Sequence, residues 1–110
     1  MLNEFFKGFV KIHILHHAAE GPIYGLQIVQ ELARHGYTSL SPGTLYPTLH
    51  SLEKAGLLIS EQQVVAGRWR KYYRVTPAGR QALTQIRAKL AELAQEVLAG
   101  QKEDTTLNDD

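Results

Sequence analysis

The stretch SPGTLYPTLHSLEKAGLL, residues 41–58, decides how we expect this chain to fold. Three of its leucines recur at helical spacing and predict one buried stripe: Leu45, Leu49 and Leu52. Ser41 followed by Pro42 is typical of a helix N-cap and its first residue, and Gly56 is typical of a helix end. Pro47, however, lies inside this helix, where it removes a backbone donor at a cost of about 3 kcal/mol.

The position of Pro47 on the helix explains how the proline is tolerated. A helical wheel places four residues on the side opposite the leucines: Gly43, Pro47, His50 and Lys54. A proline on the outer side bends the helix without opening a hole in the core, and a glycine there lets another molecule's surface come close. Four hydrogen-bonding side chains are left toward the exposed side: Thr44, Tyr46, His50 and Ser51. We interpret this side as a recognition surface; the alternative is an irregular surface helix.

The remaining sequence predicts three further helices and one β-hairpin. The expected elements are a helix over 3–19, a helix over 24–35, the helix of the quoted stretch, strands over 58–65 and 70–75, and a helix over 77–99. This order predicts a mainly α fold with a small β-hairpin, namely a winged helix-turn-helix followed by a C-terminal dimerisation helix. In that fold the third helix enters the DNA major groove, and the hairpin reaches the flanking backbone or minor groove.

We divide the chain accordingly into three parts. Residues 1–76 form the expected DNA-binding domain with its N-terminal helix, and residues 77–99 form the expected dimerisation helix. Residues 100–110 carry four acidic residues and one lysine, so we expect an acidic, disordered tail.

The predicted hairpin is basic and aromatic. Residues 68–80 contain five basic residues and no acidic one: Arg68, Arg70, Lys71, Arg74 and Arg80. Such residues neutralise DNA phosphates, and an arginine at the tip suits a narrow minor groove. Strand alternation should direct Tyr73 into the core with Val75 and leave Tyr72 for polar contacts. The alternative is a solvated basic hairpin without a partner.

Together these two elements supply the predicted DNA-binding residues. We expect His50 and Ser51 to contact base edges, and Tyr46 and Thr44 to contact phosphates. The full predicted set is Gly43, Thr44, Tyr46, Pro47, His50, Ser51, Arg68, Arg70, Lys71, Tyr72 and Arg74.

The last helix has a heptad pattern of apolar residues, which indicates a subunit contact. With two residues of the first helix, the predicted dimer interface comprises Phe5, Phe9, Leu83, Ile86, Leu90, Leu93 and Val97. The alternative is that the last helix folds back onto its own core. A cavity between subunits, lined by Phe5, Phe9, Leu90, Leu93 or their neighbours, is where we expect a small effector to bind.

Composition excludes several other classes of protein. The chain has 110 residues, a net charge of +1 and no cysteine, so it has no disulfide or thiolate chemistry. We find no membrane span and no signal peptide, and therefore expect a cytoplasmic protein. No phosphate loop, nucleophile elbow or metalloprotease motif is present, so we expect neither an enzyme nor a cofactor.

Three histidines near the N-terminus leave another possibility open. His13 and His17 are four residues apart and could share one ion, and Glu20 lies four residues beyond His16. We assign no metal ligand, since a closed site normally has three or four ligands. A regulator that senses metal or pH through His13, His16 and His17 remains an alternative. A winged-helix module that binds another protein is a second.

Three sequence blocks, in this order, resemble those of one known family. They are IYGLQIVQEL (23–32), GTLYPTLHSLEKAGLL (43–58) and GRWRKYYRVTPAGR (67–80). Over about residues 8–80 the chain resembles the PadR family of bacterial transcriptional regulators. The resemblance implies a winged-helix homodimer that represses transcription by binding operator DNA. Some members release DNA when small aromatic or drug-like compounds bind near the dimer interface.

The resemblance also assigns individual positions and shows departures. The matching residues are Tyr24, Gly25, Gly43, Thr44, Tyr46, Pro47, Lys71, Tyr72, Tyr73, Arg74, Thr76, Pro77 and Gly79. Trp69 stands where the family commonly has proline. The single C-terminal helix is similar to that of the small subfamily, and it lacks the tryptophan with which some drug-binding members line an interfacial pore.

Overall fold

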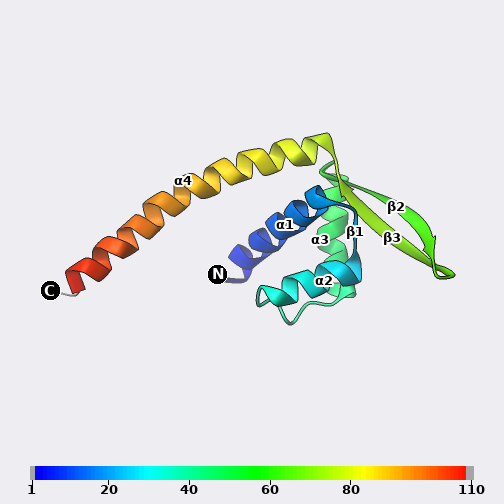
Figure 1. The fold of residues 1–110 in the computed structure, drawn as a ribbon, viewed down its shortest axis with the longest axis horizontal. Coiled ribbons are helices and arrows are strands. Elements are labelled where there is room, and N and C mark those ends of the chain that lie inside the picture. The colour runs from blue at the N-terminus through cyan, green and yellow to red at the C-terminus, as the bar shows by residue number, and fades with distance from the viewer. Residues whose placement is uncertain (1, 109–110) are drawn as a thin grey trace.

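The computed structural model describes the backbone of residues 2–108 and the side chains of residues 2–99. Its elements follow the order α1 (Leu2–Glu20), β1 (Ile23–Tyr24), α2 (Gly25–Arg34), α3 (Pro42–Lys54), β2 (Leu58–Val65), β3 (Arg68–Val75) and α4 (Pro77–Asn108) (Figure 1). The strands form an antiparallel sheet in the order β1-β3-β2. The predicted fold class is therefore confirmed. The two-residue strand β1 is an addition that the sequence did not predict.

The core lies where α1, α2 and α3 meet the sheet and the start of α4. The predicted leucine stripe of α3 is confirmed, because Leu45, Leu49 and Leu52 are all 5% exposed or less. Ile14 of α1 and Leu32 of α2 have no exposed surface, so the three helices share one core.

The ends of the helices are set by the residues that the sequence indicated. Gly36 follows α2 with φ +92° and Gly56 follows α3 with φ +79°, a left-handed conformation that glycine adopts without strain. At the start of α4, the Gly79 amide donates to Thr76 Oγ1 at 2.9 Å. A Cβ at Gly79 would clash with the Leu57 carbonyl oxygen, so glycine lets α4 begin directly against the chain before β2.

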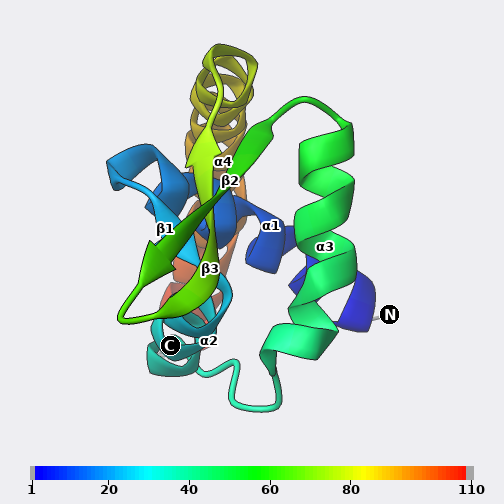
Figure 2. The same cartoon turned by 90° about the vertical axis from the view of Figure 1, so that its right-hand side faces the viewer.

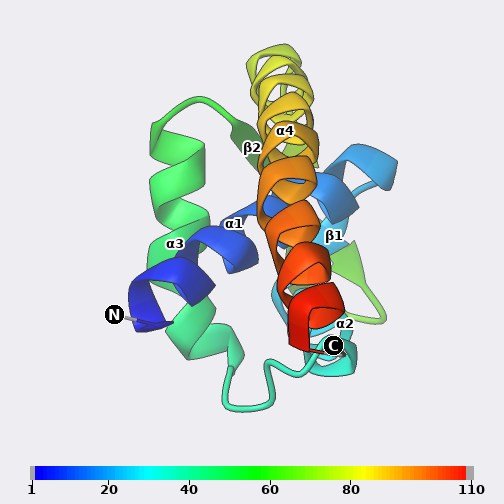
Figure 3. The same cartoon turned by 90° about the vertical axis from the view of Figure 1, so that its left-hand side faces the viewer.

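The last helix differs most from its predicted form. It continues to Asn108 rather than ending near residue 99, because Gly100 alone, with no proline or chain reversal after it, does not stop a helix. Residues 109–110 of the expected tail lie outside the described part. α4 projects away from the body of the molecule (Figures 1 and 3). With α4 included, the molecule measures 64 × 29 × 23 Å along its principal axes. Within residues 2–108 no helix is long and apolar enough to cross a membrane.

The heptad pattern of α4 is divided between two roles. Leu83 is 2% exposed and belongs to the core of its own chain, and Ile86 packs partly against that core. Beyond Ile86, the residues at the heptad positions Leu90, Leu93 and Val97 are exposed. We predicted Leu83 in a subunit contact; this residue is instead covered by α1 and the sheet, so only the outer part of the pattern is free for a partner.

Candidate nucleic-acid interface

The N-terminus of α3 is held by a reciprocal cap between Ser41 and Thr44. Thr44 Oγ1 accepts a hydrogen bond from the Ser41 amide at 2.8 Å, and the Thr44 amide donates to Ser41 Oγ at 3.3 Å. The Thr44 hydroxyl also donates to the Ser41 carbonyl oxygen at 2.9 Å. The hydroxyl that we expected on a phosphate is thus engaged in the cap, and Thr44 serves to fix where α3 begins.

The outer side of α3 carries the predicted recognition residues. All six of them are exposed: Gly43, Thr44, Tyr46, Pro47, His50 and Ser51. Pro47 does not interrupt the helix, but it cannot donate the amide that would otherwise bond the Gly43 carbonyl. The missing hydrogen bond is therefore on the side away from the core. Figure 2 shows α3 at one side of the molecule.

One flank of this outer side borders α1. Pro47 and Ser51 line a groove of about 580 Å³ together with Lys7 and Lys11 of α1. We did not predict these two lysines from the sequence, although their spacing of four residues places them on one face of α1. They bring positive charge next to the recognition helix.

The other flank of α3 is joined to the hairpin through Glu53. Its Oε2 accepts a hydrogen bond from the Ser60 amide of β2 at 3.0 Å and another from the Ser60 hydroxyl. Its Oε1 lies 4.0 Å from Lys71 Nζ of β3. Glu53 therefore links the hairpin to the recognition helix.

The tip of the hairpin is tighter than we predicted. Ala66 and Gly67 alone form the turn, with φ +53° and +76°, which is the pattern of a two-residue type I′ turn. Arg68 and Trp69, expected in the loop, are paired with Val65 and Val64. Trp69 is 72% exposed, so this indole lies in solvent near the tip of the hairpin.

Strand alternation divides the basic residues of β3 between two faces. Lys71 shares a face with Tyr73, which is 2% exposed and packs in the core as predicted. Burial is the main cause that raises the pKa of Tyr73, with a smaller effect of the Glu53 carboxylate. Lys71 therefore lies on the side of the sheet that carries α3.

The opposite face of β3 holds an aromatic and arginine cluster that depends on β1. Tyr24 pairs with Tyr72 across the strands, and their rings meet edge to face at 5.4 Å. The Arg70 guanidinium lies 4.2 Å from the centre of the Tyr24 ring. The sequence predicted Arg70 and Tyr72 in the interface but not Tyr24 as the surface that positions Arg70.

Arg74 is on the same face as Arg70 but already has an acidic partner. Its Nη2 lies 3.3 Å from Glu61 Oε1, and Gln63 Nε2 donates to the same oxygen at 2.8 Å. The hydrogen bonds from Gln63 and Arg74 lower the pKa of Glu61 below its ordinary value. Arg74 consequently offers less free positive charge than Arg68 or Arg70.

These features define a winged helix-turn-helix protein with a recognition helix and an attached basic wing. A protein-family model described as the transcriptional regulator PadR-like family matches residues 14–85. The chain therefore belongs to the PadR-like family of transcriptional regulators, and it is not an enzyme.

Known proteins agree with this assignment. The chain is 61% identical over 100 residues to the transcriptional regulator Rv3488 of Mycobacterium tuberculosis, with 91% of this chain and 92% of that protein covered. A PadR family regulator from Eggerthella lenta has a similar structure, with a TM-score of 0.74 and 36% identity, covering 88% of this chain and 85% of that one. Bacillus subtilis PadR, solved in complex with operator DNA, shares the fold with a TM-score of 0.63 and 22% identity, covering 70% and 45% of the two chains.

Proposed function

We propose that this regulator is a homodimeric, sequence-specific DNA-binding repressor that acts in the cytoplasm. The observation that carries the proposal is the joined arrangement of α3 and the wing, in which Glu53 contacts both β2 and β3. A helix with its recognition side exposed and a basic hairpin held beside it match the shape of a major groove and its flanking backbone. The operator complex of the Bacillus subtilis protein supports the same use of the fold.

The division of labour within the interface follows from the chemistry of each residue. His50 and Ser51 project from the outer side of α3 toward base edges, with Tyr46 next to them on phosphates. The wing contributes phosphate contacts through Arg68, Arg70 and Lys71, whose charges attract DNA of any sequence. This surface offers no arginine, asparagine or glutamine on α3 for a bidentate base contact, so DNA shape contributes to specificity.

The proposed dimer contact lies along α1 and the outer part of α4. Five apolar residues of this region expose between 39% and 56% of their surface to solvent: Phe5, Phe9, Leu90, Leu93 and Val97. α4 projects as a single helix about 48 Å long, at 1.5 Å per residue, and single helices depend on packing for stability. A second copy of the chain would cover these side chains and place two recognition helices one DNA turn, or about 34 Å, apart.

A small effector would act through the same region. A cavity of about 330 Å³ lies between α1 and α4 of one chain, with Phe9 and Leu90 among its lining residues. Leu93 lines a neighbouring cavity on α4, also of about 330 Å³. A ligand that changes how α1 packs on α4 would change the distance between the two recognition helices and so the affinity for DNA.

Selection of DNA fragments from a random pool tests the proposal directly. We expect enrichment of a pseudo-palindromic sequence, and gel shifts whose affinity falls steeply between low and moderate salt. A protein-interaction module would show neither enrichment nor a steep salt dependence, and that result would end the proposal.

A further inference from the structure

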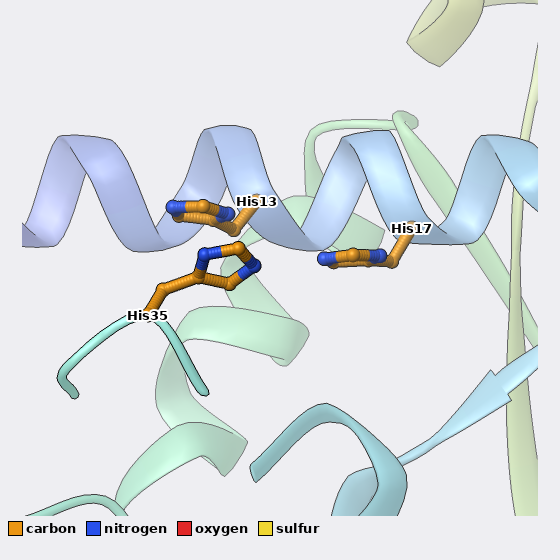
Figure 4. Close-up of side chains that lie close together, drawn as sticks. All are labelled: His13, His17 and His35. Carbon is orange, nitrogen blue, oxygen red and sulfur yellow. The ribbon is translucent and has the colours of Figure 1, made fainter. Parts of the chain in front are cut away.

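Three histidines that are distant in sequence come together beside α1. His13 and His17 lie one turn apart on α1, and His35 reaches them from the end of α2 (Figure 4). The ring centres of His13 and His35 are 4.6 Å apart, and the coordinating nitrogens of all three residues lie within 4.8 Å of one another. The sequence suggested His16 as the companion of His13 and His17, but tertiary structure supplies His35 instead.

His17 has a nitrogen available for a ligand. Its Nε2 is buried and has no hydrogen-bond partner within the described residues. Its Nδ1 lies 3.5 Å from Glu20 Oε1, so the carboxylate favours the tautomer with the proton on Nδ1 and the lone pair on Nε2. A carboxylate behind a histidine in this way is typical of metal sites, where it orients the ring and raises its basicity.

The surroundings favour a neutral His13 ring and a bound cation. Burial, followed by the charges of His35, His17 and His16, lowers the pKa of His13 from its ordinary 6.5. Neutral imidazole is the form that binds a metal. His35 is also the C-cap of α2, where the partial negative charge of the helix end attracts a cation.

We propose that His13, His17 and His35 bind one divalent transition-metal ion of the zinc type, which would fasten α1 to the end of α2. Three imidazoles suit zinc, cobalt or nickel and do not suit magnesium or calcium, which prefer oxygen ligands. Tetrahedral zinc with bonds of about 2.0–2.1 Å brings its nitrogens to about 3.3 Å from one another. The three rings therefore need only small rotations to converge, and the fourth position stays open to water.

His16 does not belong to this site. Its Nε2 lies 3.1 Å from Glu20 Oε1, and its Nδ1 lies 3.2 Å from an Arg87 nitrogen. A competing cluster of His16, His17 and Glu20 nevertheless has its coordinating atoms equally close. The two clusters share only His17, so variants of the other residues distinguish them.

The ion would also act on the segment that leads to the recognition helix. Only residues 36–40 separate His35 from the Ser41 cap of α3. A metal bond at His35 would restrain this segment and raise the stability of the helix-turn-helix. Metal binding itself can be measured without DNA, so its failure and a failure of the proposed DNA-binding function are separate results.

Titration calorimetry with zinc on untagged full-length protein, first freed of metal with a chelator, tests the site. We expect one zinc ion per chain, no measurable heat of binding with magnesium, and weaker binding as pH falls through the histidine range. His35→Ala changes an exposed residue at a helix end and should abolish zinc binding while the helical circular dichroism is kept. His13→Gln should do the same, and Glu20→Gln should weaken binding by about 10- to 100-fold.

His16→Ala and His50→Ala serve as matched controls, since they remove histidines outside the site and should leave one zinc ion bound. Retained binding in His35→Ala, combined with loss in His16→Ala, would assign the metal to the competing cluster and overturn the proposal. Absence of zinc binding to the unmodified protein would overturn it as well and would leave the three rings as an aromatic stack.

Discussion

Glu53 on α3 and Ser60 on β2 are joined by two hydrogen bonds. The Ser60 amide donates to Glu53 Oε2 at 3.0 Å, and the Ser60 hydroxyl donates to the same oxygen over a shorter distance. This contact crosses from the recognition helix to the wing. Within the described residues no other side-chain hydrogen bond connects α3 to the hairpin.

Glu53→Ala should lower the free energy of unfolding by about 1–3 kcal/mol, because the Ser60 amide loses its acceptor in a partly buried place. Urea denaturation measures the change. Ser60→Ala is the control, since it keeps the amide contact and should cost less. An unchanged denaturation midpoint for Glu53→Ala would show that the joint is dispensable.

Arg70→Ala and Lys71→Ala should weaken binding to every DNA sequence and reduce the slope of log affinity against log salt by about 0.9 for each lost phosphate contact. Arg74→Ala is the control from the same strand, because Arg74 is paired with Glu61 and should change the slope less. Gel shifts at several salt concentrations give the slopes. Equal slopes for all four proteins would mean that the wing does not touch the backbone.

His50→Ala or Ser51→Ala should alter which sequences are preferred, because these residues stand toward base edges; a good base contact contributes about 1–3 kcal/mol of discrimination. Repeating the fragment selection with each variant measures the preference. Lys54→Ala, also exposed on the outer side of α3, should lower affinity without altering the selected sequence. If the selected sequence is the same for all variants, the recognition surface is misassigned.

Replacing Leu90 and Leu93 by serine should give monomers at concentrations where the unmodified protein is dimeric, because it removes apolar surface that is exposed in the single chain. Light scattering coupled to gel filtration reports the mass. Leu83→Ala should behave differently and cost about 2–5 kcal/mol of folding stability, since this leucine is buried in its own core. A double variant that stays dimeric contradicts the proposed interface.

The unfolding free energy of the metal-free protein should decrease as pH falls below about 6.5. Burial depresses the pKa of His13 in the folded state, so the unfolded chain binds the proton more readily. The stability that this depressed pKa contributes is fully present above the pKa of His13 in the unfolded chain. It is lost as pH falls to the lower pKa of His13 in the folded protein. The groups around His13 are His16 and His17 of α1, with His35 and Tyr37 beyond α2. Urea titrations in chelator, with His13→Gln as the comparison, should show a flatter pH profile for the variant.

Local signals accounted for most of the elements. The leucine stripe of α3, the Ser41 cap and the glycines after α2 and α3 act over one or two helical turns, so their neighbours in sequence are enough to predict them. The core position of Tyr73 followed from strand alternation for the same reason. The recognition side of α3 was predictable because a periodic helix with one buried stripe must expose the opposite side.

Other features depended on residues that meet only in the folded chain. The strand β1 has two residues, too few to show a period, and it exists through its pairing with β3. The stacking of Arg70 on Tyr24 follows from that pairing. The sequence also could not predict which heptad residues of α4 are buried and which are exposed. An apolar repeat looks the same whether its leucines pack in the core of their own chain or against a second subunit.

The sequence by itself determined the winged helix-turn-helix order, the exposed side of the recognition helix and the basic character of the wing, since periodicity, caps and charge are properties of neighbouring residues. Only the tertiary structure decided that Glu53 contacts the wing, that Leu83 is buried in the core of its own chain, and that His35 completes a cluster with His13 and His17. Each of these features depends on packing between elements that are distant in the chain. Contacts of this kind leave no pattern among neighbouring residues of the sequence.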